Sequence, residues 1–105
     1  MTQYDLAFSI EALIPYFFPE IKSKKTTDCV FIEFRKNRLM FSITFYMESF
    51  NCSNFEGKLK KLNSFLKMDG ISSLDDLIRH ETDEEKDSIT YYYKIPLNLA
   101  QGFSD

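Results

Sequence analysis

This sequence has few of the residues on which disulfide-rich domains, metal sites and phosphate loops depend. It contains two cysteines in 105 residues, Cys29 and Cys52, with one histidine, three glycines, three prolines and no tryptophan. Two cysteines so far apart make neither a disulfide framework nor a Cys-x-x-Cys metal site, and isolated glycines do not build a phosphate-binding loop. We therefore expect reduced, buried thiols, no cofactor and no metal ligands.

Long apolar runs are missing as well. No positively charged start leads into an apolar segment, and no run approaches the length of a membrane span. The sequence thus predicts a cytoplasmic protein that does not insert into a membrane.

Catalytic groups are equally scarce. His80 would have to reach Cys29 or Cys52 to form a nucleophilic pair, and no residue is marked as its orienting partner. The acidic residues after His80 lack the spacing and the glycine of a calcium loop, and such runs are usually solvated. We expect no catalytic residues and conclude that the chain is not an enzyme.

Apolar and aromatic residues, by contrast, are plentiful. They make up 44% and 16% of the chain, which is enough for one core, and the length suits a single compact domain over 1–105. The formal charge of −3 is mild, yet acids and lysines occur in separate groups along the chain. This segregation favours a charged recognition surface more than the net charge does.

The clearest structural signal is a β-hairpin over 29–47. With Lys36-Asn37 as a two-residue loop, every facing pair on one side is apolar: Phe34 with Leu39, Ile32 with Phe41, and Val30 with Ile43. A slip by one residue would turn this row to solvent, so burial should fix the register. A three-residue loop with a bulge at Asn37 is the alternative.

Helical signals flank this hairpin. Within residues 4–14, Ser9 fits the N-cap of a short helix that runs through Ile14, although the alternation of the apolar residues at 4, 6, 8 and 10 also fits a strand. Pro15 to Pro19 would then form a rigid aromatic corner. A capping box, Ser53-x-x-Glu56, predicts a helix that ends at Asp69-Gly70. Its apolar stripe consists of Phe55, Leu59, Leu62, Phe65 and Leu66.

The last third of the chain predicts a second short helix, a charged loop and a strand. The helix begins at Ser73 and runs to about Glu81, the loop spans 80–87, and the strand spans 88–95 with Pro96 as its stop. Together these elements predict an α+β fold in which a small antiparallel sheet, the hairpin 29–47 plus the strand 88–95, packs against two or three short helices. The added strand fits either hairpin edge, and a free edge would allow a homo-oligomer.

Our first functional hypothesis is a small acidic protein-binding domain, an inhibitor or immunity-type protein that blocks a macromolecular partner. Its character resembles immunity proteins against nuclease toxins and phage inhibitors of host defence enzymes only in general terms, through small size, acidity and absence of motifs. The acidic loop would attract a basic partner, and the outward tyrosine of the strand would supply contact area. The candidate partner-binding residues are Glu81, Asp83, Glu84, Glu85, Asp87 and Tyr92.

The second hypothesis is nucleic-acid binding. Basic residues crowd the predicted hairpin tip beside an outward phenylalanine, and a lysine-rich helix follows, so rings could stack on bases while cations hold phosphates. The negative net charge and the absence of an RNA-binding motif count against it. The residues concerned are Phe31, Arg35, Lys36, Arg38, Lys58 and Lys61.

Overall fold

The fold is taken from a computed structural model that describes residues 2–21, 29–35, 39–46, 53–71, 77–85 and 87–103. These residues form two long helices, a short 3-10 helix, four strands and a short helix near the end of the chain. The elements in order are α1 (Gln3–Phe17), η1 (Pro19–Ile21), β1 (Val30–Phe34), β2 (Met40–Tyr46), α3 (Phe55–Met68), β3 (Leu77–Asp83), β4 (Ser88–Lys94) and α4 (Leu97–Gln101).

The first segment is a helix, and it is longer than predicted. Thr2, not Ser9, caps α1: the Asp5 amide donates to the Thr2 hydroxyl at 3.1 Å, and the Asp5 carboxylate accepts from the Thr2 amide at 2.9 Å. Ser9 lies inside the helix and its hydroxyl donates to the Asp5 carbonyl. Pro15 is accommodated within α1, so the rigid corner predicted from Pro15 to Pro19 is wrong over its first half.

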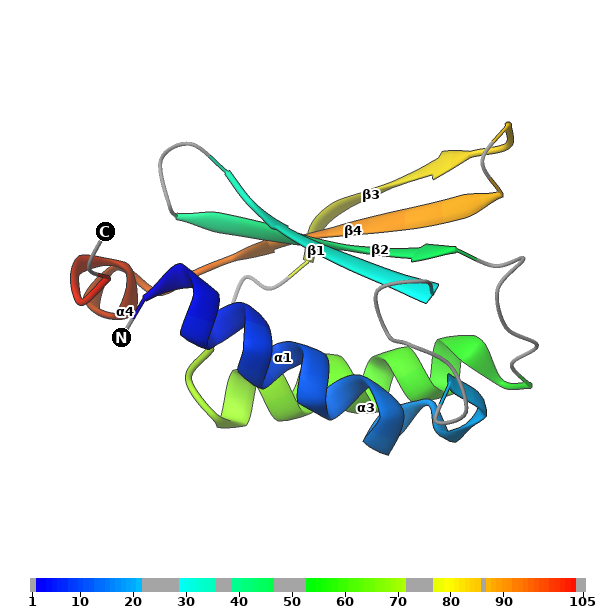
Figure 1. Cartoon of the computed structure of the whole chain (residues 1–105), viewed down its shortest axis with the longest axis horizontal. Coiled ribbons are helices and arrows are strands. Elements are labelled where there is room, and N and C mark those ends of the chain that lie inside the picture. Colours follow the sequence, from blue (N-terminus) through cyan, green and yellow to red (C-terminus); the bar gives the residue numbers. More distant parts are fainter. Residues whose placement is uncertain are drawn as a thin grey trace.

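All neighbouring strands of the sheet are antiparallel, in the order β1-β2-β4-β3 (Figure 1). The hairpin is confirmed, but its predicted register is wrong by two residues, because Phe34 faces Phe41, Ile32 faces Ile43 and Val30 faces Phe45. An even shift leaves every side chain on its predicted face, so the apolar row is still buried. The shift lengthens the connection, whose residues 36–38 lie outside the described ones.

The strand predicted over 88–95 is confirmed as β4, and it joins the β2 edge of the hairpin. The short helix predicted over 73–81 is wrong from Leu77 onward, because Leu77–Asp83 is strand β3 and pairs with β4. The start of that predicted helix, at 72–76, lies outside the described residues. The charged loop is correspondingly shorter than predicted, because 80–83 belong to β3.

Helix α3 is confirmed, but its predicted N-cap residue is wrong. Its N-cap is Asn54, in the left-handed region at φ 55°, and not Ser53 as the capping box predicted. Its end is as predicted: Gly70 takes φ 73°, its amide donates to the Lys67 carbonyl, and the Ile71 amide donates to the Leu66 carbonyl. This is a Schellman closure, and Ile71 and Leu66 are both buried beside it.

The two long helices lie together on one face of the sheet, and in the described part of the chain no helix covers the other face (Figure 1). The core between the layers is largely aromatic. Phe41 stacks on Tyr93 with ring centroids 5.0 Å apart, and Phe18 and Phe55 both contact Phe45. The predicted α+β class, an antiparallel sheet against helices, is therefore confirmed, with one more strand than expected.

Candidate protein-binding surface

The open face of the sheet carries the outward-pointing residues of its strands in rows. Phe31, Thr44 and Thr90 form one row across β1, β2 and β4, and the Thr44 and Thr90 hydroxyls lie 2.7 Å apart in a hydrogen bond. The next row toward the β3-β4 turn pairs Tyr46 with Ser88 and Ser88 with Asp83. Strand alternation thus places two aromatic residues, hydroxyl groups and an acid on the same face.

These rows line a hollow of about 670 Å³ that extends to the β3-β4 turn. Its walls are mostly polar, and its charged residues are all acidic among those described. The lining consists of Phe31, Glu33, Thr44, Tyr46, Thr82, Asp83, Glu84, Glu85, Ser88 and Thr90. We call this surface the acidic hollow. It joins three acids of the predicted partner-binding set to two aromatic residues, Phe31 and Tyr46.

Local backbone geometry sets the positions of the acids. The Glu85 amide donates to the Asp83 carboxylate at 3.1 Å, and Asp87 closes the turn with φ 51°. Such a turn suits Asp, which tolerates the left-handed region. Glu84, Glu85 and Asp87 are exposed, so their carboxylates are available to a cationic partner.

The other residues of the predicted partner-binding set lie elsewhere. Asp87 lies in the turn beside the hollow, and Glu81 lies in β3, where its backbone pairs with Thr90. Tyr92 faces outward as predicted, but only 8% of its surface is exposed, and the Arg35 guanidinium lies 4.7 Å from the centre of its ring. Tyr92 therefore serves as the base for Arg35 in this structure, and little of its ring is accessible.

The described residues of the nucleic-acid hypothesis are divided between the sheet and the helical layer. Phe31 lies in the acidic hollow, where carboxylates would repel phosphates, and Arg35 follows the end of β1 and lies beside Tyr92. Lys58 and Lys61 belong to α3 in the helical layer, and Lys58 forms an ion pair with Glu20. Lys36 and Arg38 lie outside the described residues.

Sequence reasoning missed several residues of the acidic hollow. Glu33, Thr44, Tyr46 and Thr90 were not assigned to a site, although their alternation with buried residues already placed them on the outward face. The sequence analysis did not identify β3 as the partner of β4. Once β3 is recognised as a strand, its acidic end, at Asp83, must lie beside the start of β4, at Ser88.

The described part of the chain shows no set of three or more histidine, cysteine or acidic side chains arranged to hold a metal ion. None of its helices has the length and apolarity to cross a membrane. Cys29 is buried, as expected, and Cys52 lies outside the described residues.

Comparison of the chain with protein-family models, curated proteins and solved structures finds no significant match.

Proposed function

We propose that this chain is a non-catalytic cytoplasmic protein-binding domain that blocks a macromolecular partner by binding a basic segment of it in the acidic hollow. One observation carries the proposal: Asp83, Glu84 and Glu85 share a single hollow with Phe31, which is 49% exposed. Carboxylates steer a basic partner and orient it, while an exposed ring supplies apolar contact area.

The inhibitory role follows from the chemistry of the partner. Enzymes that act on nucleic acids, such as nuclease toxins and host defence enzymes, need basic surfaces to neutralise phosphates. A domain that presents clustered carboxylates at a fixed place competes for those surfaces. The described lining of the hollow contains hydroxyls and carboxylates but no histidine, cysteine or lysine, so occupation of the partner, not its modification, is the activity we propose.

The test is a quantitative capture experiment from the native host. The wild-type chain, Glu84→Lys/Glu85→Lys and Phe31→Ala serve as baits, and the captured protein is then assayed for activity with and without the chain. We expect both variants to lose at least about tenfold in affinity, as expected when charge pairs and an aromatic contact are removed from an interface. Inhibition should fall in parallel.

Asp69→Lys is the control, because it makes the charge change of one of these two substitutions at an exposed site at the end of α3. It should leave capture and inhibition unchanged. Equal capture by all baits would remove the acidic hollow from the interface. Salt-sensitive binding of the wild-type chain to a single-stranded oligonucleotide at low ionic strength would instead support the nucleic-acid hypothesis.

A further inference from the structure

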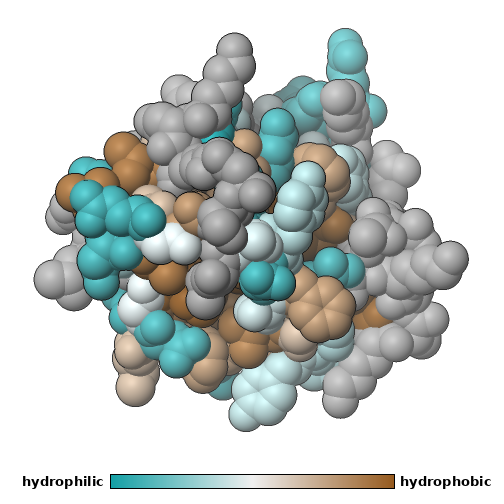
Figure 2. All heavy atoms as spheres, turned by 60° about the vertical axis from the view of Figure 1, so that its left-hand side comes forward, coloured by the Kyte–Doolittle hydropathy of each residue, from teal (hydrophilic) through white to brown (hydrophobic). Residues whose placement is uncertain are grey.

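A second surface, on the helices, has different chemistry and does not depend on the acidic hollow. Tyr4, Phe8 and Tyr16 recur on the solvent side of α1 and are 86%, 75% and 75% exposed, while the opposite side of the same helix buries Leu6, Ile10 and Ile14. Large aromatic side chains grouped on the exposed side of a helix mark a surface that meets another molecule. In Figure 2, brown atoms reach the surface over the lower half, where the helices lie.

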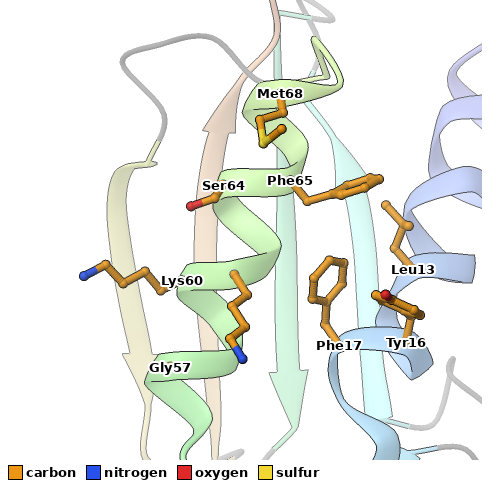
Figure 3. A pocket seen from close by; sticks show the side chains of 9 residues that line it. Leu13, Tyr16, Phe17, Gly57, Lys60, Ser64, Phe65 and Met68 are labelled. Atoms are coloured by element: carbon orange, nitrogen blue, oxygen red, sulfur yellow. The ribbon is translucent and has the colours of Figure 1, made fainter.

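Between α1 and α3 this surface deepens into a groove of about 770 Å³. Phe17 and Phe65 meet across it with ring centroids 5.7 Å apart. Figure 3 shows Phe65 pointing from α3 toward Leu13 of α1, with Phe17 below it and Met68 at the upper end. Met68 is 88% exposed, and an unbranched, adaptable side chain at this position suits contact with another apolar surface. We call this surface the helix groove.

The walls of the helix groove determine the conformation of its occupant. They are side chains of two helices, whose backbone groups are bonded within the helices, so they offer no row of amides and carbonyls to an extended chain. An extended peptide would therefore bury unpaired backbone groups there. A helix satisfies its own backbone and needs only an apolar stripe.

The charges of the groove determine the composition of that helix. The charged residues described in its lining are Lys60 and Lys61. Lys61 lies four residues from both Gly57 and Phe65, which places it on the groove side of α3. Lys60 projects from α3 on the side away from Phe17 and α1 (Figure 3). Cations at the edge of an apolar groove favour acidic residues beside the stripe of the incoming helix.

The groove also has a definite length. Its α3 side runs from Gly57 to Met68, which corresponds to about 16 Å along the helix axis, or about three turns. We propose that the helix groove binds a short amphipathic α-helix of a partner protein, with an apolar stripe flanked by aspartate or glutamate. This occupant is opposite in charge to the basic segment assigned to the acidic hollow, so either proposal can be contradicted without affecting the other.

The probe is a displayed library of amphipathic helical peptides of about 15 residues, with randomised flanks around a leucine stripe, selected on the full chain. We expect enrichment of aspartate and glutamate in the flanks. Synthetic copies of the enriched peptides should lose at least about tenfold in affinity for Lys61→Glu and for Met68→Glu, because each change places a carboxylate against an acidic helix. Met68 is so exposed that the second variant should fold normally.

Lys94→Glu is the matched control for Lys61→Glu. It makes the same charge reversal at an exposed residue of β4, away from the groove. It should retain wild-type affinity. Basic or neutral flanks, no enrichment, or enriched peptides that bind Lys61→Glu and Met68→Glu as tightly as the wild type would each overturn the proposal. So would sedimentation showing a dimer that Met68→Glu dissociates, or stronger binding to anionic vesicles than to any peptide, because the surface would then serve a second copy or a membrane.

Discussion

Tyr91 is a buried side chain whose pKa is also affected by a charged residue, Glu56. It lies on the core side of β4, where its ring packs near Phe45 and Phe55 and is 8% exposed. Burial raises the pKa of its phenol above the ordinary 10.0, and the negative charge of Glu56 raises it further. Neutral Tyr91 therefore stabilises the fold fully below pH 10.0, and this stabilisation is lost as the pH rises through the raised pKa.

We expect Glu56→Gln to lower the pKa of Tyr91 without returning it to 10.0, because burial is the larger cause and persists in the variant. The measurement is an NMR titration of the tyrosine ring-carbon signals. Asp69→Asn, which removes a charge at the other end of α3, is the control. An unchanged pKa in Glu56→Gln would show that the carboxylate does not act on this ring.

Among the elements, the start of α3 holds an unusual pair. Asn54 takes the left-handed conformation at φ 55°, and its side chain lies over Gly57. A Cβ added at Gly57 would come within 2.6 Å of the side-chain amide nitrogen of Asn54. Asn54 makes no side-chain capping bond. The glycine thus accommodates the asparagine, at the cost of a poor helix-forming residue in the first turn.

Replacement of Gly57 should consequently depend on residue 54. In an Asn54→Gly background, Gly57→Ala should raise the free energy of unfolding by about 0.5–1 kcal/mol, the usual gain from alanine in a helix. In the wild-type background the gain should be smaller or reversed, because the Asn54 side chain must move. Urea unfolding of the four proteins tests this, and equal effects in both backgrounds would contradict the steric coupling.

The connection of α3 to the sheet gives another prediction. The Tyr93 hydroxyl donates to the Asn63 side-chain oxygen at 2.6 Å, while the Tyr93 ring stacks on Phe41. Tyr93→Phe keeps the ring and removes the donor, so a double-mutant cycle with Asn63→Ala should give a coupling of about 1 kcal/mol. Chemical unfolding measures it, and additive effects would mean that the bond contributes nothing to stability.

How far the sequence predicts this fold also differs between elements. The hairpin and α3 were predictable because their apolar residues repeat at periods of two and of three to four. The register of the hairpin was not predictable from this repeat, because a shift by two residues leaves every side chain on the same face. The length of the connecting loop then decides which register forms. Strand β3 was missed because Leu77 and Ile78 fit a helical stripe locally, and only pairing with β4 makes this segment a strand.

The same contrast holds for the candidate site. Three acids of the acidic hollow, Asp83, Glu84 and Glu85, were named from their clustering in the sequence, whereas their place beside Phe31 and Tyr46 depends on the sheet order β1-β2-β4-β3. Tyr92 was assigned to the correct face of β4. The Arg35 guanidinium that lies over its ring comes from a residue far away in the sequence, so this contact could not be predicted. Strand alternation predicts the direction of a side chain but not what lies over it.

At the scale of the whole molecule, opposite charges are separated by the core. The acidic hollow is lined by the sheet and the β3-β4 turn, and the helix groove by α1 and α3. The sheet and the helices form separate layers (Figure 1), and the aromatic core lies between them. The molecule is at least 24 Å across in every principal direction, while surface charges are screened over about 8 Å at physiological salt. The two surfaces share no residue.

We therefore expect the two surfaces to bind independently. Glu84→Lys/Glu85→Lys should change the affinity of an acidic helical peptide for the groove by less than about twofold, because distant sites without shared contacts are additive. Lys61→Glu should likewise leave capture of the basic partner unchanged. Titration calorimetry at physiological salt, with each ligand alone and with the other at saturation, measures the coupling directly. A larger effect that persists at high salt would require an element with two packed arrangements between the sheet and the helices, since screened charges alone could not transmit it.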